Sequence, residues 1–336
     1  MKAAKLIKPG TIVISEEKMP QIENEHEVLV KVRAVGICGT DIHIFEKGRE
    51  DVLLPRILGH ELAGEVVETG HGVRKIQVGD HVVLDPVFSC KTCKICRRGQ
   101  SNVCTNVKCY GVQMDGGFQE YIVVEEEHLY AFSPQISWKQ AAIAEPFSIG
   151  ANIVSRGMVS AEDHVVVIGS GTIGLCAAQA AKWTGARVLV SDVEDRKLDI
   201  AKKAGIDMTV NSAKTSLEEA VEKFSPGGAD VVIDAVGTAA LVECGIRLTA
   251  PGARVVVIGF DNKPVEIPPS VTTKKELMII GSRMNRHRFP MVIEWLEAGK
   301  IRDDIMVTAE YRFEDIQRAF EETVKNRNNI KSVIFM

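Results

Sequence analysis

Four cysteines fall within fifteen residues in the stretch VFSCKTCKICRRGQSNVC, and they are half of the chain's eight cysteines. A cluster this dense is typical of a disulfide knot, a redox centre, a nucleic-acid-binding finger or a metal site. The N-terminal segment has no apolar run of signal-peptide length, so we expect a cytoplasmic, reducing environment in which cysteines stay as thiols or thiolates. The spacing therefore favours a metal site made by Cys90, Cys93, Cys96 and Cys104.

Four thiolates from one short lobe, residues 88–106, leave a zinc ion no open coordination position. Such a closed site contributes to folding rather than to catalysis. A nucleic-acid finger would call for a basic protein and a recognition helix, whereas this chain has a formal net charge of -4. We predict a structural zinc site here, and no nucleic-acid partner.

A second pattern is Gly-x-Gly-x-x-Gly in VVVIGSGTIGLCAAQAAKWTGARVLVSD. It follows an apolar strand and opens a helical pattern, which is the context of a dinucleotide-binding turn. Its first glycine would allow the tight turn, the second the approach of a pyrophosphate to the backbone, and the third close packing of helix on strand. The predicted cofactor-binding residues of this turn are Gly169, Gly171, Thr172, Ile173 and Gly174.

Asp192 ends the next strand, 18 residues after Gly174. Its carboxylate can accept hydrogen bonds from the ribose hydroxyls of adenosine but would repel a 2'-phosphate, so NAD is favoured over NADP. Arg196 and Lys197 complete the predicted cofactor site, and their charge could partly compensate a phosphate. The alternative role for Asp192 is a helix N-cap or a solvated strand end.

Three separate patches hold further ligand-type residues: GICGTDIHIFEKG with Cys38, ILGHELAGEV with His60 and Glu61, and AAIAEPFSIG with Glu145. One cysteine, one histidine and carboxylates suit an open zinc sphere, because a catalytic site takes about three protein ligands and leaves a position for water or substrate. Each residue also has an ordinary structural role, as a small buried hydrophobe, a core histidine or an acid at a helix end. Spacing alone leaves both interpretations open.

The elements that must position these residues fall into two kinds. Residues 1–150 consist of short strands broken by Gly and Pro, as in HEVLVKVRAVGI, where Val28, Val30 and Val32 share one face. Residues 151–284 contain apolar runs that alternate with helical patterns, which indicates a doubly wound parallel sheet of an α/β domain. A tail of two amphipathic helices and a last strand, residues 285–336, is expected to return to the first domain. No stretch reaches the length of a membrane span.

Together, GICGTDIHIFEKG, Gly59-His60-Glu61 followed by AGEVVETG, the cysteine lobe, DGGFQEYIVV, AEPFSIG and GSGTIG resemble the zinc-dependent medium-chain alcohol and polyol dehydrogenases. The order and spacing match over essentially the whole chain. The glutamate of AEPFSIG resembles the sorbitol and threonine dehydrogenase branches, and GSRMNRHRFPMVIEWLEAGKI is closer to bacterial dehydrogenases of hexonic acids such as L-galactonate or L-gulonate. The resemblance implies a GroES-like catalytic domain, residues 1–150 completed by 285–336, and a Rossmann NAD-binding domain, residues 151–284.

By this resemblance, Cys38 and His60 are ligands of a catalytic zinc, Glu61 binds that zinc in some states, and Glu145 is a further ligand, direct or through water. Thr40 and His43 resemble the family's proton relay. With the cysteine lobe, the resemblance implies two zinc ions per chain, one catalytic and one structural.

The implied reaction is hydride transfer from a secondary alcohol to NAD. Arg283 best matches the arginine that the polyol branch places against its substrate, and Arg286, His287 and Arg288 follow closely. A guanidinium pairs bidentately with a carboxylate, so this positive charge suits a sugar acid better than a neutral polyol. The alternative is a solvated basic loop or a subunit contact.

We therefore expect a small-molecule substrate, a polyol or hexonate, no membrane partner, and a homodimer or homotetramer as in the family. Within the same class, the alternative is a 2,3-butanediol or L-threonine type dehydrogenase. Alternatives of other classes are a metal-free reductase of the quinone-reductase kind and a non-catalytic thiol redox sensor built on the cysteine lobe.

Overall fold

The computed structural model, which describes residues 1–326 and 328–336, divides the chain into two units. Unit 1 comprises residues 1–145 and 289–336, and unit 2 comprises residues 146–288. These boundaries lie within five residues of those expected from the sequence. Each unit buries a hydrophobic core of its own.

Unit 1 is built around β3 (Glu27–Ile37), where alternation in the sequence becomes burial in the structure. Val28, Val30 and Val32 are buried, whereas Lys31 and Arg33 stay partly exposed. The main sheet has the order β10-β6-β5-β3-β18-β17, with β9 also paired to β3, and β2-β1-β4 and β7-β8 form smaller sheets. This β-rich unit corresponds to the catalytic domain expected from the sequence.

The elements of unit 1 are β1 (Lys2–Lys8), β2 (Thr11–Glu16), β3, α1 (Gly39–Lys47), β4 (Arg56–Ile57), β5 (Glu61–Thr69), β6 (His81–Leu84), β7 (Val87–Phe88), η1 (Cys96–Arg98), η2 (Ser101–Val103), β8 (Lys108–Cys109), β9 (Tyr121–Glu125), η3 (Glu126–His128), β10 (Leu129–Phe132), α2 (Trp138–Ala142), α9 (Phe289–Glu297), α10 (Asp303–Met306), β17 (Val307–Arg312), η4 (Phe313–Asp315), α11 (Ile316–Lys325) and β18 (Lys331–Phe335).

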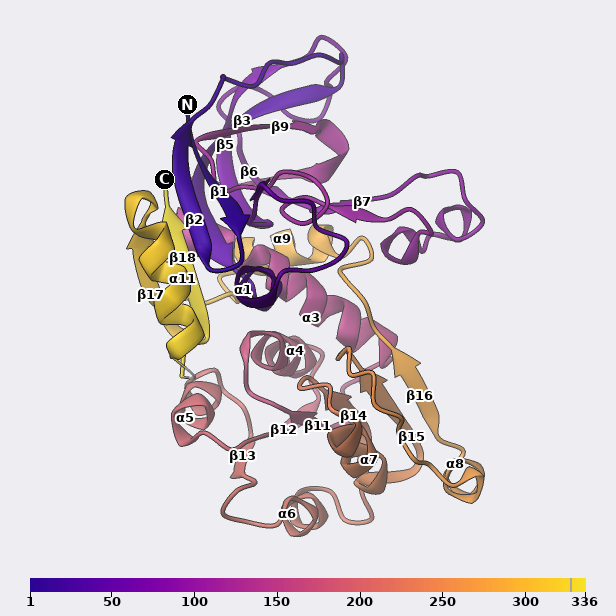
Figure 1. Cartoon of the computed structure of the whole chain (residues 1–336). Coiled ribbons are helices and arrows are strands. Elements are labelled where there is room, and N and C mark those ends of the chain that lie inside the picture. The colour runs from indigo at the N-terminus through magenta and orange to yellow at the C-terminus, as the bar shows by residue number, and fades with distance from the viewer. Residues whose placement is uncertain (327) are drawn as a thin grey trace. The chain divides into compact units, whose positions relative to one another are not determined.

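The C-terminal tail completes the main sheet of unit 1. β18 runs antiparallel to β3, with Ser332 opposite Ile37, and β17 runs parallel to β18. Figure 1 shows this yellow segment beside the indigo N-terminal strands, where α11 contacts β2 and α1. Residues almost 300 positions apart in the sequence thus become neighbours, and this places Lys331 next to the strands that carry the predicted ligands.

Unit 2 is a parallel sheet in the order β13-β12-β11-β14-β15-β16, with every neighbouring pair parallel. The order reverses between β11 and β14, which is the switch point where such folds bind dinucleotides. The buried faces of α6 and α7 pack on one side of the sheet, and α4 lies on the other (Figure 1). The predicted doubly wound α/β fold is confirmed.

The elements of unit 2 are α3 (Ala144–Arg156), whose first turn precedes the unit boundary, β11 (His164–Ile168), α4 (Thr172–Trp183), β12 (Arg187–Asp192), α5 (Asp195–Lys203), β13 (Met208–Asn211), α6 (Leu217–Phe224), β14 (Ala229–Asp234), α7 (Ala239–Arg247), β15 (Thr249–Val257), α8 (Pro269–Lys275) and β16 (Met278–Gly281).

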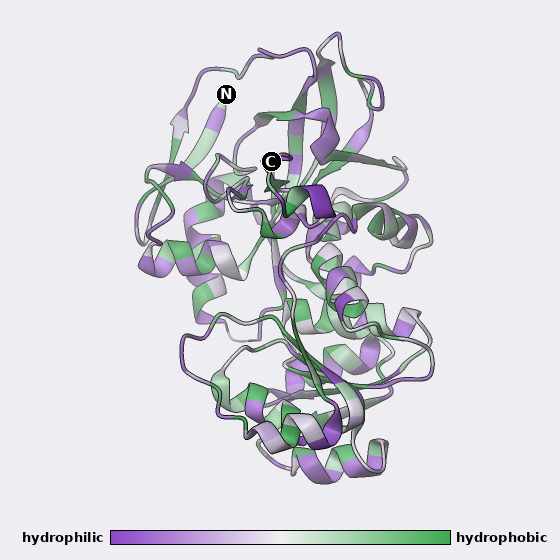
Figure 2. Cartoon of the chain, turned by 90° about the vertical axis from the view of Figure 1, so that its right-hand side faces the viewer, coloured by the Kyte–Doolittle hydropathy of each residue, from purple (hydrophilic) through white to green (hydrophobic). Residues whose placement is uncertain are grey.

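Hydropathy follows the layers of each unit. Figure 2 shows helices that carry both green hydrophobic and purple hydrophilic segments, as expected of helices that cover a sheet with one face. Within the described residues, no helix has the length and apolar character needed to cross a membrane.

Candidate metal centres and cofactor site

The four cysteines of the lobe converge. The Sγ–Sγ separations are 3.4 Å for Cys90–Cys104, 3.5 Å for Cys93–Cys96, 3.9 Å for Cys93–Cys104 and 4.0 Å for Cys90–Cys96. A tetrahedron of sulfurs with zinc–sulfur bonds of about 2.3 Å has edges of about 3.8 Å. A disulfide would need sulfurs about 2.05 Å apart. The separations therefore suit a metal centre and not a disulfide knot.

Backbone donors prepare the lobe for metal binding. The N–H of Cys96 donates to Cys93 Sγ at 3.4 Å, and the N–H groups of Cys96 and Thr105 lower the pKa of the Cys93 thiol to about 5. Lys91 joins the lobe to the neighbouring segment through a 2.6 Å ion pair with Glu127. The lobe thus offers four sulfur ligands, the number that fills a tetrahedral zinc sphere.

A second ligand set comes from two separated segments of unit 1. Cys38 immediately precedes α1, while His60 and Glu61 lie at the start of β5. Their ligand atoms all lie within 4.8 Å of one another. His60 and Glu61 are buried, and Cys38 is partly buried. The fold therefore brings together three residues that sequence spacing keeps apart.

Asp41 fixes the backbone around this set. Its carboxylate accepts from the N–H of Cys38 at 2.9 Å and from the N–H of Gly59 at 3.3 Å, and it lies 3.7 Å from His60 Nδ1. Burial raises the pKa of Asp41. Burial alone would lower the pKa of His60, but Cys38 and Asp41 outweigh it and raise that pKa well above its usual range. The negative groups around His60 therefore favour a positive charge at the ligand set.

Lys331, the first residue of β18, supplies one such charge. Its side chain is 2% exposed, and Nζ donates to the Ile37 carbonyl at 3.0 Å and to Glu61 Oε1 at 2.5 Å. Burial alone would lower the pKa of Lys331, but Glu61 and Cys38 raise it, so the ammonium stays charged. A lysine is almost never fully buried unless it is paired. The C-terminal strand is thus bound to the ligand set by a buried ion pair.

Glu145 lies in the first turn of α3 and is buried. Burial and the charge of Glu61 raise the pKa of Glu145, and His60 lowers it, which together leave it at about 7, so the charge of Glu145 depends on the ligand set. Among the described residues, however, the group with ligand atoms within 4.8 Å of one another is Cys38, His60 and Glu61, and it does not include Glu145. Its role as a further ligand stays a prediction.

Two buried atoms of the ligand set have no hydrogen-bond partner among the described residues. They are His60 Nδ1 and Glu61 Oε2. An unsatisfied buried polar atom costs about 1–3 kcal/mol, unless a ligand binds it. Imidazole nitrogen, carboxylate oxygen and thiolate are all zinc ligands, and a dication would offset the negative charge of Cys38 and Glu61. The residues present therefore fit zinc.

The predicted proton-relay residues lie on α1. Thr40 and His43 are three residues apart, so they share a face of the helix. Thr40 is half-buried and His43 is exposed. The pair therefore spans from the interior of unit 1 to solvent, and its role in proton transfer stays a prediction.

The glycine motif forms the turn between β11 and α4. Gly169 has a φ of 99°, in the left-handed region that favours glycine, and a Cβ on Gly174 would lie 1.9 Å from the Gly169 carbonyl oxygen. Around Gly171, by contrast, no described atom beyond its chain neighbours lies within 4 Å of where a Cβ would be. The open space beside Gly171 and the N-terminus of α4 together suit a pyrophosphate.

Asp192 is fixed against this turn. Its Oδ2 accepts from the N–H of Ser170 at 2.7 Å, and its Oδ1 accepts from the N–H groups of Val193 at 2.8 Å and Glu194 at 3.0 Å. The carboxylate therefore also acts as the strand-end cap considered as its alternative role. Two carboxylate oxygens accept about four hydrogen bonds, so capacity remains for a ribose hydroxyl. Arg196 is exposed and Lys197 is half-buried on the following helix α5.

Arg283 lies in the segment 282–288, which follows β16 and which we call the arginine loop. Arg283 and His287 are exposed, while Arg286 and Arg288 are partly buried. Burial, together with the charge of Arg286, lowers the pKa of Arg288. The arginine loop thus concentrates positive charge within unit 2.

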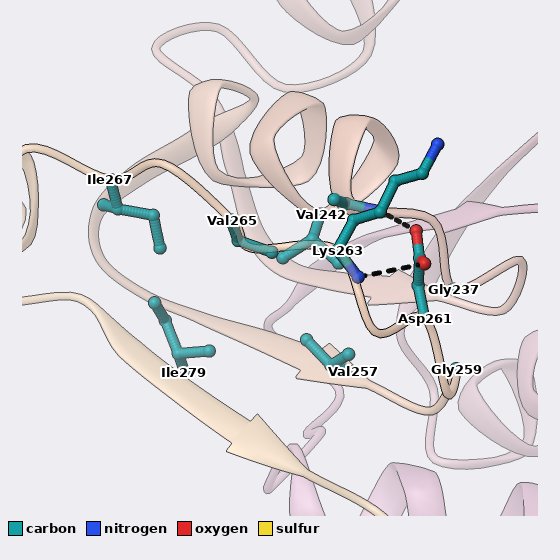
Figure 3. Close-up of a pocket in the computed structure, with 10 residues that line it drawn as sticks. Gly237, Val242, Val257, Gly259, Asp261, Lys263, Val265, Ile267 and Ile279 are labelled. Atoms are coloured by element: carbon teal, nitrogen blue, oxygen red, sulfur yellow. Dashed lines mark hydrogen bonds between the residues drawn. The ribbon is translucent and has the colours of Figure 1, made fainter.

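A pocket of about 280 Å³ is lined by residues of α7, β15 and β16 and of the segment that follows β15, and none of the predicted site residues lines it (Figure 3). Its walls are mainly aliphatic, and Asp261 accepts from the N–H groups of Ala239 and Lys263 at 3.1 Å each. The carboxylate of Asp261 thus binds the backbone of the pocket wall, and the remaining lining is mainly aliphatic.

Sequence reasoning missed Lys331 and Asn152, of which the second is described below. It noted Asp41 as a ligand-type residue of GICGTDIHIFEKG but assigned it no role. A lysine at the start of the apolar strand KSVIF was the available signal for Lys331, because charged residues seldom enter such strands. Asp41 stands three residues after Cys38, at the spacing of a helix-capping carboxylate. For Asn152 we find no local signal.

Comparison with known proteins agrees with this geometry. Residues 24–134 match the alcohol dehydrogenase GroES-like domain family, and residues 172–298 match the zinc-binding dehydrogenase family. Sorbitol dehydrogenase of Bacillus subtilis is 33% identical over 99% of this chain and 96% of its own, and L-galactonate-5-dehydrogenase of Escherichia coli is 33% identical over 97% and 96%. The solved alcohol dehydrogenase RspB of E. coli, complexed with NADH, is 34% identical with a TM-score of 0.94, covering 100% of this chain and 99% of its own.

The chain therefore belongs to the zinc-binding alcohol dehydrogenases with a GroES-like domain. The predicted fold class and family are confirmed, and the protein is an oxidoreductase of the alcohol and polyol dehydrogenase class.

Two glycine variants test the cofactor turn. We expect Gly171→Ala to keep the melting temperature but to weaken NADH binding at least about tenfold, because its Cβ enters the space left for pyrophosphate. Gly174→Ala should instead lower the melting temperature by more than about 4 °C, since its Cβ meets the Gly169 carbonyl. Thermal melts and NADH fluorescence titrations separate the two; equal NADH affinity in wild type and Gly171→Ala would contradict the assignment.

Metal analysis of two cysteine variants tests the two centres. Wild-type protein should hold two zinc ions per chain, and Cys38→Ala should lose one with the smaller fall in melting temperature of the two variants. Cys93→Ser should lose the other and melt markedly lower, because a structural zinc contributes directly to folding. If the wild-type protein held only one zinc ion and Cys38→Ala kept it, the open site would be ruled out.

Removing Lys331 tests the buried ion pair. Lys331→Met should cost about 3–5 kcal/mol, because it leaves the Glu61 carboxylate buried without a counter-charge. Lys139→Met is the matched control, since Lys139 pairs with Asp303 and Glu310 at the surface and should cost at most about 1 kcal/mol. Urea unfolding measures both, and equal stabilities would show that the pair is dispensable.

Proposed function

We propose that the protein oxidises a secondary alcohol of a sugar acid, such as a hexonate, or of a polyol, with zinc at the Cys38 set and NAD as hydride acceptor. The observation that carries this proposal is the buried set Cys38, His60 and Glu61, in which His60 Nδ1 and Glu61 Oε2 have no described hydrogen-bond partner. A closed structural site would account for the cysteine lobe but not for this second, open set.

Zinc held by Cys38, His60 and Glu61 would act as a Lewis acid that lowers the pKa of an alcohol toward neutrality. The chain's own residues account for the remaining requirements. Lys331 balances Glu61 and keeps that carboxylate oriented. Glu145 would be a further ligand, direct or through water.

The oxidation separates the alcohol's two hydrogens. NAD⁺ bound at the glycine turn would accept the hydride from the carbinol carbon. Thr40 would receive the hydroxyl proton, and His43 would pass it to solvent. The half-buried position of Thr40 and the exposure of His43 suit this direction.

NAD is the proposed cofactor because Asp192 puts a carboxylate at the end of β12, beside the glycine turn, and a carboxylate there would repel a 2'-phosphate. Asp192 keeps capacity for ribose hydroxyls, and its contact with the Ser170 N–H holds it at the glycine turn. One solved relative is bound to NADH and another to NADP, so the preference for NAD rests on Asp192.

The arginine loop supports a sugar acid as substrate. Arg283 is exposed within a segment of concentrated positive charge, and a guanidinium binds a carboxylate in a bidentate fashion. Relatives of equal identity act by name on sorbitol and on L-galactonate. We assign the sugar acid because a neutral polyol offers no counter-charge for this loop.

A homodimer or homotetramer is the proposed assembly. β16 lies at the end of the sheet order, and Met278 and Ile279 on it are each 43% exposed. An edge strand with apolar side chains is suited to pairing with a second copy.

A substrate panel tests the proposed activity. With NAD, hexonates should give a higher kcat/KM than pentitols, hexitols, 2,3-butanediol or L-threonine. Arg283→Ala should raise KM for the hexonate at least about tenfold, from loss of a charge-assisted pair. Arg247→Ala, an exposed arginine of α7, is the control and should leave KM unchanged. If no sugar acid exceeds sorbitol, the substrate assignment is wrong; turnover of butanediol or threonine with indifference to Arg283→Ala would establish the alternative.

A further inference from the structure

The arginine loop has an unusual backbone. Met284, Arg286 and His287 have φ values of 51°, 45° and 59°, in the left-handed region that residues with side chains seldom adopt. Each such residue costs of the order of 1–3 kcal/mol and persists only where its surroundings impose the conformation. Three of them within four residues show that contacts from outside the loop hold its shape.

One buried amide on α3 supplies such contacts. Asn152 is fully buried, and its Nδ2 lies 2.8 Å from the Met284 carbonyl, 3.2 Å from the Arg283 carbonyl and 3.3 Å from Ser282 Oγ. The donors of this one side chain are therefore directed at the residues that flank and include the first left-handed position. Both partners belong to unit 2.

The same helix holds the two ends of the segment. Arg156 Nε donates to the Gly281 carbonyl at 3.2 Å, and Arg288 Nη2 donates to Ser155 Oγ at 2.6 Å. Within the loop, Asn285 is buried and accepts from the His287 N–H at 3.0 Å. The two ends of the loop therefore have anchors of their own, whereas Asn152 contacts the carbonyls of Arg283 and Met284.

Stability alone does not explain an asparagine at this position. Asn152 Oδ1 is buried and has no hydrogen-bond partner among the described residues, which costs about 1–3 kcal/mol. An apolar side chain of similar size would avoid that cost but would leave the Arg283 and Met284 carbonyls without this donor. The asparagine therefore lowers the stability of the fold but fixes the backbone conformation of the arginine loop.

We propose that Asn152 is a positioning residue that determines specificity for the acidic substrate. It fixes the backbone at Arg283 and Met284, so the Arg283 guanidinium meets the carboxylate of a sugar acid in a preset orientation. The inference rests on the proposed function for the identity of the substrate. The claim that Asn152 fixes the loop backbone does not depend on the identity of the substrate.

A double-mutant cycle tests the coupling to Arg283. Asn152→Ala and the isosteric Asn152→Asp, which lacks the amide donors, should each raise KM for the preferred sugar acid at least about fivefold, with kcat and KM for NAD unchanged within about twofold. In the Arg283→Ala background, Asn152→Ala should add nothing further. Gln179→Ala removes another buried amide, which donates to the Leu175 carbonyl within α4, and should leave KM for the sugar acid unchanged. Fold changes that multiply in the double variant would overturn the proposal.

Hydrogen exchange measured without substrate gives a second readout. Peptides covering residues 281–289 should exchange at least about tenfold faster in Asn152→Asp than in wild type, while those of α4 and β11 should not change. Unchanged exchange in this segment would overturn the positioning role whatever the substrate proves to be. If Arg283→Ala changes KM for no substrate but hydrogen exchange of the loop is faster in Asn152→Asp, the substrate assignment is wrong and the positioning of the loop by Asn152 is supported. If Asn152→Ala does not fold, Asn152→Asp carries both measurements.

Discussion

The buried ion pair between Lys331 and Glu61 is the interaction on which the open ligand set of unit 1 depends. Glu61 has one oxygen on the ammonium and the other without a partner in the described structure, so the carboxylate is both neutralised and available. The pair also requires that β18 lie next to β3, because Lys331 donates to the Ile37 carbonyl as well. The same ion pair therefore fixes the position of the C-terminal strand and balances the charge of the ligand set. A cation at this site relieves the negative surroundings that raise the pKa of His60.

The two predicted metal sites differ in how the fold makes them. The cysteine lobe assembles its sulfurs within one short loop, with backbone N–H groups as local support. The open set needs the helix start at Cys38, the strand start at Glu61 and the carboxylate of Asp41 that joins them. A local loop can fold around its ion, whereas the open set depends on the whole sheet of unit 1. This difference suits a structural role for one and a reactive role for the other.

The same distinction decides what could be predicted from the sequence. The cysteine lobe and the glycine turn are local patterns, and the structure places their residues as the spacing implies: Gly174 packs against Gly169, and Gly171 stays open. Cys38, His60 and Glu61 are far apart in the chain, and only the resemblance to a family joined them in advance. The roles of Lys331 and Asn152 could not be predicted because their partners are far away in the sequence. Lys331 meets its partners where β18 pairs with β3, and Asn152 meets its partners where α3 contacts the arginine loop. Glu145 shows the remaining limit, since charge couples it to the ligand set without bringing it into that set.

The most direct test of the central claim is anomalous diffraction at the zinc absorption edge from crystals of the zinc-supplemented protein. The account predicts two anomalous peaks in each chain. One should lie among the sulfurs of Cys90, Cys93, Cys96 and Cys104, and the other should lie between Cys38, His60 and Glu61. A peak in the cysteine lobe alone, with Glu61 and Lys331 still paired and no density at His60, would contradict the account.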